Sequence, residues 1–334
     1  MNKNTNDFAP AITLMFLAPL IAEVLPGATR FSSIFVFPVE VCVWGGGALL
    51  IRYAVKRWQL PWTSMLLLAL ALAVAEECII QQTSLAPLVI RLKGLTYARA
   101  AGINYVYLLW ALIYESTFVV FVPICLVELI YPARKERRWI SKGGFFAVSP
   151  LFLLGSLLAW YSWNHIARTK VFHLPLYTPP AIAMILSVTL ILLLIITALK
   201  TKPTPSQHSK TAPHLTLLST LPAIWAILLF AIALLAFGIA PQFPPALAIL
   251  LGLLLAITAI TTVPRWNLSP HHLFILLASI LTGSMAVSFI GFIDTAGPDL
   301  YFKIIINFIA VVLLIPLGSK IRKHADTSRQ SESL

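Results

Sequence analysis

Long apolar runs, separated by short polar connections, dominate the pattern of this chain. Ten runs are long enough, at about 20 residues, for helices that cross a bilayer. They lie near residues 9–27, 34–55, 61–80, 103–131, 145–164, 178–199, 215–238, 243–263, 272–292 and 300–318. The runs are continuous rather than alternating, which argues against a membrane barrel. The pattern therefore predicts an all-α, polytopic transmembrane helical bundle with about ten spans.

Composition supports a membrane protein. Only 11% of the residues are charged and 59% are hydrophobic, whereas a soluble domain has roughly 25% charged residues. The lipid bilayer is thus the expected partner. The opening MNKNTNDFAP has no clear positive region, so we expect the first run to be a retained span.

The basic residues predict an orientation. With alternating spans, 17 of the 24 Lys and Arg fall on one side, including Lys3 and Lys210, and 7 fall on the other. The basic side is normally cytoplasmic, so both termini are expected in the cytoplasm. The net charge of +12 follows from this bias, and no basic patch interleaved with aromatics predicts nucleic-acid binding.

The chain divides into three regions by polarity. Residues 1–165 form a polar-studded bundle of five spans, residues 166–319 form an apolar bundle with a cytoplasmic linker near 200–214, and residues 320–334 form a basic and polar tail. Residues 81–102 connect spans three and four on the outer side. They are consistent with an interfacial helix, a re-entrant segment that acts as a lid, or a plain surface loop.

Acidic residues inside the spans are the most informative feature. Half of the 12 acidic residues lie in the first four runs, although a charge at a helix centre costs about 2.5–3.5 kcal/mol. They are Glu23, Glu40, Glu76, Glu77, Glu115 and Glu128. Counting residues along each span places the first four near the outer side, Glu115 near mid-depth and Glu128 near the inner surface. The depths predict that the first five converge on one outward-opening cavity.

Several polar neighbours fit such a cavity. Gln81 follows Glu77 by four residues, Asn104 shares a helical face with Glu115, and His165 ends span five at a compatible depth. The Pro26-Gly27 pair, Pro38, Pro123 and the glycines 45–47 loosen the helices nearby or allow close packing. The predicted substrate- or ion-binding residues are Glu23, Glu40, Glu76, Glu77, Gln81, Asn104 and Glu115. The identity of any metal or cofactor is left unknown.

One hypothesis is transport, in which the glutamates bind protons or cations and couple them to a substrate. The chain contains no Walker loop, dinucleotide fingerprint, GxSxG or HExxH motif. ATP-driven transport by this chain alone is therefore not expected. A different hypothesis is a non-catalytic assembly factor, whose acids pair with basic residues of this chain or of a partner protein.

An intramembrane enzyme is the third hypothesis. The segment AEECIIQQ resembles the first motif of the CPBP family of glutamate-dependent intramembrane proteases, which includes the CAAX prenyl endopeptidases. Glu76 and Glu77 match the glutamate pair, and Gln81 stands where that family has an arginine. Tyr161 and His165 fit the aromatic residue four before a histidine. The family's last motif, a histidine four residues before an asparagine, has no match. The resemblance implies a glutamate-activated water, with Glu76, Glu77 and His165 as catalytic residues.

A broader resemblance covers roughly the first 135 residues. The segments APLIAEVLPG, GGGALLIR and PICLVELIYP, with the glutamate pair, are similar to a group of uncharacterised bacterial polytopic membrane proteins. This resemblance implies a multi-pass protein of the bacterial inner membrane. It brings no activity and therefore does not decide among the three hypotheses.

Overall fold

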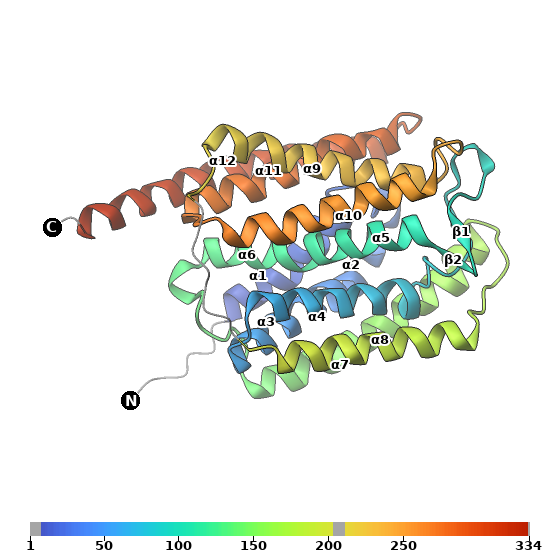
Figure 1. The fold of residues 1–334 in the computed structure, drawn as a ribbon, viewed down its shortest axis with the longest axis horizontal. Coiled ribbons are helices and arrows are strands. Elements are labelled where there is room, and N and C mark those ends of the chain that lie inside the picture. The colour runs from blue at the N-terminus through green and yellow to red at the C-terminus, as the bar shows by residue number, and fades with distance from the viewer. Residues whose placement is uncertain (1–7, 203–210, 333–334) are drawn as a thin grey trace.

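The computed structural model describes residues 8–202 and 211–332, and it confirms the all-α membrane architecture. Helical rods run side by side in a single bundle (Figure 1). In the described part of the chain, nine of them are long and apolar enough to cross a membrane, and a shorter apolar helix, Phe8–Val24, precedes them. Lys3, Lys210 and most of the predicted linker lie outside the described residues. The cytoplasmic assignment of the termini stays a prediction.

The first rods are composite, because α-helical segments alternate with the wider turns of π-helix. Helix α1 (Phe8–Pro19) continues through a π turn at Leu20–Val24. The second rod joins a 3₁₀ turn (Phe31–Val36), α2 (Phe37–Glu40), a π segment (Val41–Gly45) and α3 (Gly46–Trp58). Helix α4 (Trp62–Ala75) ends in a π segment at Glu76–Ile80. The fourth rod joins α5 (Tyr105–Tyr114), a π segment (Glu115–Phe121) and α6 (Val122–Ile130).

The remaining rods are mostly regular helices. They are α7 (Lys142–Tyr161) with a π segment at Ser162–Val171, α8 (Ala181–Lys200), α9 (Leu215–Ala236), α10 (Pro245–Thr262), α11 (Pro270–Ser288) and α12 (Pro298–Glu332). Short 3₁₀ turns occupy Leu92–Gly94, Pro132–Arg134, Val263–Arg265 and Phe289–Phe292.

Burial separates a central group of rods from a lipid-facing rim. In the three long spans that carry the glutamates, 56–61% of the most apolar window is buried, but in the spans of α8 and α12 only 11% is. Helix α11 is also central, with 50% buried. Because lipid can solvate apolar side chains, the rim helices need no polar face. The glutamate-bearing spans are therefore in the interior of the bundle.

The segment between spans three and four is an irregular loop rather than an interfacial helix. It contains a small antiparallel hairpin of β1 (Arg99–Ala100) and β2 (Ile103–Asn104). Its beginning is buried against the bundle, and Ser84 has no exposed surface. Four of its residues that are not glycine adopt left-handed backbone angles, which cost energy for residues with a Cβ; these are Gln82, Lys93, Ala98 and Ala101.

The predicted glycine triplet allows close helix packing. A Cβ on Gly45 would lie 2.0 Å from the backbone oxygen of Met15 in α1, and a Cβ on Gly47 would lie 2.9 Å from a Leu72 methyl in α4. Gly46 leaves space for ordinary contact with Phe152 in α7. The triplet therefore lets the second rod touch the first, third and fifth rods directly, which fixes the centre of the bundle.

The two ends of the bundle carry different polar structures. The hairpin and the α11–α12 connection lie at one end, whereas the α6–α7 connection lies at the other (Figure 1). We call the first the hairpin end and the second the Arg52 end, after the buried arginine that organises it. The hairpin end corresponds to the predicted outer side.

Candidate functional site: buried glutamates at π-helical turns

Every glutamate of the predicted cluster lies in or beside a π-helical segment. Glu23 is within Leu20–Val24, and Glu40 immediately precedes Val41–Gly45. Glu76 and Glu77 open the segment Glu76–Ile80, and Glu115 opens Glu115–Phe121. A π turn inserts one residue into a helix and reorients the side chains around it, and such turns are frequent at functional sites.

The structure brings each of the five carboxyl groups within electrostatic range of Glu23 or Glu76. Glu23 interacts with each of the other four. Glu76 likewise interacts with Glu40, Glu77 and Glu115. The common depth predicted from the sequence therefore corresponds to real proximity across four rods. Like charges at this separation repel, so the group is not stable with all members ionised.

Glu76 is the most isolated member of the cluster. Its side chain is 2% exposed, and neither carboxyl oxygen has a hydrogen-bond partner in the described part of the protein. Burying an ionised carboxylate without a partner costs far more than burying a neutral acid. In this closed arrangement, Glu76 is therefore stable only in its protonated form.

Glu77 differs from its neighbour because the loop at residues 81–104 supplies it with donors. Its Oε2 accepts hydrogen bonds from the hydroxyls of Thr83 and of Ser84, the latter at 2.8 Å. Both donors sit in the buried start of the loop. The loop therefore covers one carboxyl of the pair and leaves the other without donors.

Glu40, Glu23 and Glu115 differ in burial and in the hydrogen bonds that their residues accept. Glu40 is 5% exposed, and its Oε1 accepts from the Thr29 hydroxyl, while Oε2 has no partner among the residues that the structure describes. Glu23 is half-buried, and its backbone oxygen accepts from Thr29 N at 3.0 Å. Glu115 is 8% exposed. Thr29 thus ties the connection between the first two rods to both acids.

The remaining predicted site residues lie around the cluster in different settings. Gln81 is half-buried, and its N–H donates to Glu76 O at 2.8 Å to close the π turn. Asn104 caps α5, because its Oδ1 accepts from Tyr107 N at 2.9 Å, and its amide donates to Tyr97 O at 3.1 Å. These bonds give Asn104 a structural role at the base of the loop.

His165 contacts aromatic side chains of its own helix. Its ring stacks on Tyr161 at 5.1 Å and meets Trp160 edge-on at 4.9 Å. The adjacent Asn164 is one of two buried residues of this π segment, with Arg168, and its amide donates to Ile80 O at 3.2 Å. Sequence reasoning overlooked Asn164, whose Oδ1 lacks a partner among the described residues. A polar residue beside the proposed histidine was the available signal.

An aromatic ladder runs along α5 beside the acids. Tyr107, Trp110, Tyr114 and Phe118 follow one another with ring centroids 5.3, 5.0 and 4.8 Å apart. The Tyr114 hydroxyl donates to Ala22 O, next to Glu23, at 2.5 Å. The three- and four-residue spacing keeps the rings on one helical face. The ladder forms a packed wall on one side of the cluster.

No family model, curated protein or solved structure matches this chain. The resemblances to the CPBP family and to uncharacterised membrane proteins gain no support from these comparisons. What the comparisons and the structure together establish is a polytopic helical membrane protein with buried glutamates.

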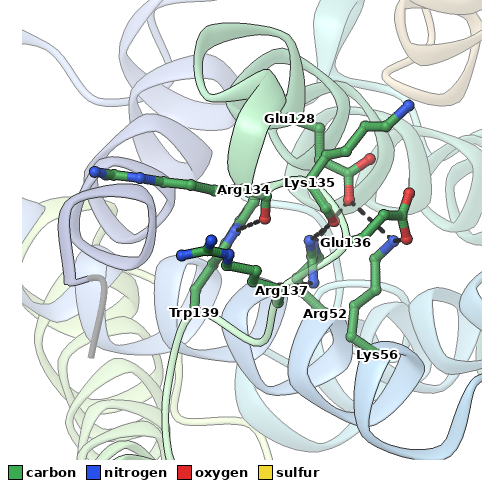
Figure 2. A network of polar contacts seen from close by, with 8 residues as sticks. All are labelled: Arg52, Lys56, Glu128, Arg134, Lys135, Glu136, Arg137 and Trp139. Carbon is green, nitrogen blue, oxygen red and sulfur yellow. Dashed lines mark hydrogen bonds and ion pairs between the residues drawn. The ribbon is translucent and has the colours of Figure 1, made fainter. Parts of the chain in front are cut away.

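The Arg52 end is closed by an ion-pair network, which Figure 2 shows. Arg52 Nε lies 2.9 Å from Glu128 Oε1, and its guanidinium covers the Trp139 ring at 3.9 Å. Lys56 lies 3.8 Å from Glu128 and 2.9 Å from Glu136. The hydrogen bond and charge of Lys56 hold the pKa of Glu136 below its usual value. Glu128 is thus a structural acid at the end of its span, as predicted.

The arrangement limits what the glutamate cluster can do. In the part of the chain that the structure describes, no group of three or more His, Cys, Asp and Glu is placed to hold a metal ion. No ion pair joins the five acids to a basic residue of the described chain, so the within-chain version of the assembly hypothesis has no support. Exchange of protons needs neither a metal cage nor a large cavity, and this arrangement of carboxyl groups suits it.

Proposed function

We propose that this protein is a proton-coupled membrane transporter and that Glu76 is the central proton carrier of its glutamate cluster. The observation that carries the proposal is the buried carboxyl of Glu76, which has no hydrogen-bond partner among the described residues and lies within range of other acids. Intramembrane acids that face the interior of a bundle commonly mark proton or ion pathways. Release of the Glu76 proton requires that water, or a hydrogen-bond donor that stabilises the carboxylate, reaches the side chain. Deprotonation of Glu76 is therefore coupled to a conformational change.

Glu77 supports the proposal because it ties the site to the loop at residues 81–104. The Thr83 and Ser84 hydroxyls donate to its carboxyl, and hydrogen bonds to an ionised acceptor are stronger than those to a neutral one. Ionisation of Glu77 therefore tightens the loop over the cluster, and protonation loosens it. Proton binding would thus change how readily the hairpin end opens.

The proposal is tested in vesicles from cells that express the full chain. An imposed pH gradient should drive uptake of at least one member of a panel of labelled solutes, and Glu76→Gln should abolish that uptake while the protein still inserts. Glu136→Gln, an exposed acid at the Arg52 end, is the matched control and should leave uptake unchanged. Unaltered flux and pH dependence in amide variants of Glu40, Glu76, Glu77 and Glu115 would refute the proposal.

The same variants separate transport from intramembrane proteolysis. If the cluster activates water as in the CPBP family, purified protein should cleave membrane-anchored peptides, and Glu76→Ala should stop the cleavage. The transport proposal expects no cleavage and a loss of pH-driven flux instead.

A further inference from the structure

Lys303 is a buried lysine that the glutamate site does not use. It lies in the second turn of α12 and is 1% exposed. Its Nζ donates to Leu25 O and to Ser288 Oγ, the latter at 2.6 Å. With its amide oriented to satisfy both neighbours, Asn307 accepts from Lys303 Nζ and donates to Leu25 O, each at 3.0 Å. All these partners are neutral.

These neutral partners satisfy the amine, but they supply no negative charge to the protonated form of Lys303. In the described chain, no carboxylate lies within ion-pair distance of Lys303. Asp299 is one turn away on α12, but its two carboxyl oxygens accept from Ser32 N and Ser32 Oγ, both at 2.9 Å. Ionisable residues in membrane spans pair with one another or with backbone carbonyls, and they commonly mark a substrate or ion pathway. The chemistry that fits this lysine is an anion.

A second basic residue lies close to Lys303. The Phe292 ring is near both, with Lys303 Nζ 5.8 Å from its centre and the Arg30 guanidinium carbon 4.6 Å from it. Arg30 is half-buried at the hairpin end, so positive charge leads from the surface towards Lys303. Gly27 adopts a left-handed backbone, and a Cβ there would lie 2.5 Å from Phe292. The connection after the first rod therefore packs closely against the Phe292 ring.

We propose that Lys303, with Ser288 and Asn307, binds the carboxylate or phosphate group of a small solute that the protein moves together with protons. This inference rests on the proposed transport function and names its substrate class. Leu25 O is released from Lys303 when the anion binds. Leu25 lies two residues after Glu23, and Thr29 of the same connection donates to Glu40. Anion binding on one side of this connection is thereby linked to the acids on the other.

The test measures thermal unfolding of the purified full chain in detergent at constant pH and ionic strength. Acetate, succinate and phosphate are compared with chloride, because a ligand that binds only the folded state raises its stability in a saturable way. We expect a saturable rise with at least one of these anions. Lys303→Met should abolish the rise, and Ser288→Ala, which keeps the ammonium group, should weaken binding about tenfold. Arg57→Gln, which removes an exposed cation at the Arg52 end, should leave binding unchanged.

The outcomes are distinct. No rise with any of the three anions, or an equal rise in Lys303→Met, would overturn the anion site. Stabilisation by phosphatidylglycerol micelles alone, lost in Lys303→Met, would overturn the solute and assign the lysine to a lipid headgroup. Glu76→Gln should keep the anion effect. Anion binding without pH-driven flux would thus refute the transport function and leave the site, whereas flux without anion binding would refute the site alone.

Discussion

Removing one member of the ion pair between Arg52 and Glu128 should destabilise the protein strongly, whereas removing the neighbouring Lys56 should not. The Arg52 side chain is 2% exposed and the Glu128 side chain 26%. In Glu128→Gln the guanidinium stays buried without its carboxylate, and removing one member of a buried pair costs about 3–5 kcal/mol. Arg52 keeps its hydrogen bonds to Lys135 O and Arg137 O. We therefore expect the lower half of that range, about 3–4 kcal/mol.

Lys56→Met provides the matched control at the same end. The Lys56 side chain is 21% exposed and Glu136 is 74% exposed, so their pair should be worth less than about 1 kcal/mol. The free energy of unfolding is measured by titration with SDS in mixed micelles, for each single variant and for the Arg52→Met/Glu128→Gln double variant. The double variant should lose much less than the sum of the two single losses. Equal costs for Glu128→Gln and Lys56→Met, or additive losses, would refute this reasoning.

Three further predictions concern packing, capping and orientation. Gly45→Ala should destabilise the protein by about 1–3 kcal/mol in the same titration, because the added Cβ would meet the backbone of Met15 and not a flexible side chain. Asn104→Ala should cost about 1 kcal/mol through loss of the α5 cap and should speed proteolysis of the loop at residues 81–104. In a variant without the native cysteines, an impermeant thiol reagent added outside intact cells should label Lys93→Cys but not Lys135→Cys, and the reverse result would invert the predicted topology.

The sequence was sufficient to predict the bundle and the depth of the acids, because both depend only on counting along apolar runs. Glu76 and Glu115 come from different spans, yet residue counting places them within about a turn or two of each other in depth, and the structure brings them into electrostatic range. Glu128 was placed at an interface for the same reason and pairs there with Arg52. The predicted depth of a residue in the membrane changes little with small errors in helix geometry.

Side-chain direction was harder to predict than depth. A helix that is apolar on all sides has no periodic pattern that fixes which face points inward. The π segments then change the register, so that Asn164 rather than His165 is buried at the end of the fifth rod. The prolines near Glu23, Glu40 and Glu115 indicated irregular helices, but no proline marks the π turn at Glu76. The donors to Glu77 were also missed, because Thr83 and Ser84 reach it only after the loop folds back.

The contrast between the two ends of the bundle indicates which end admits water to Glu76. At the Arg52 end, access requires separation of the Arg52–Glu128 ion pair and of the hydrogen bonds that Arg52 donates to Lys135 O and Arg137 O. At the hairpin end, the loop is held to Glu77 by two hydroxyl groups, and each neutral hydrogen bond contributes about 0.5–1.5 kcal/mol once Glu77 is protonated. The left-handed residues of this loop, such as Gln82, favour its release further. Amide hydrogen exchange should therefore be faster at residues 82–86 than at residues 134–139, and the difference should shrink when pH is raised enough to ionise Glu77. Faster exchange at the Arg52 end would place the opening on the opposite side of the cluster.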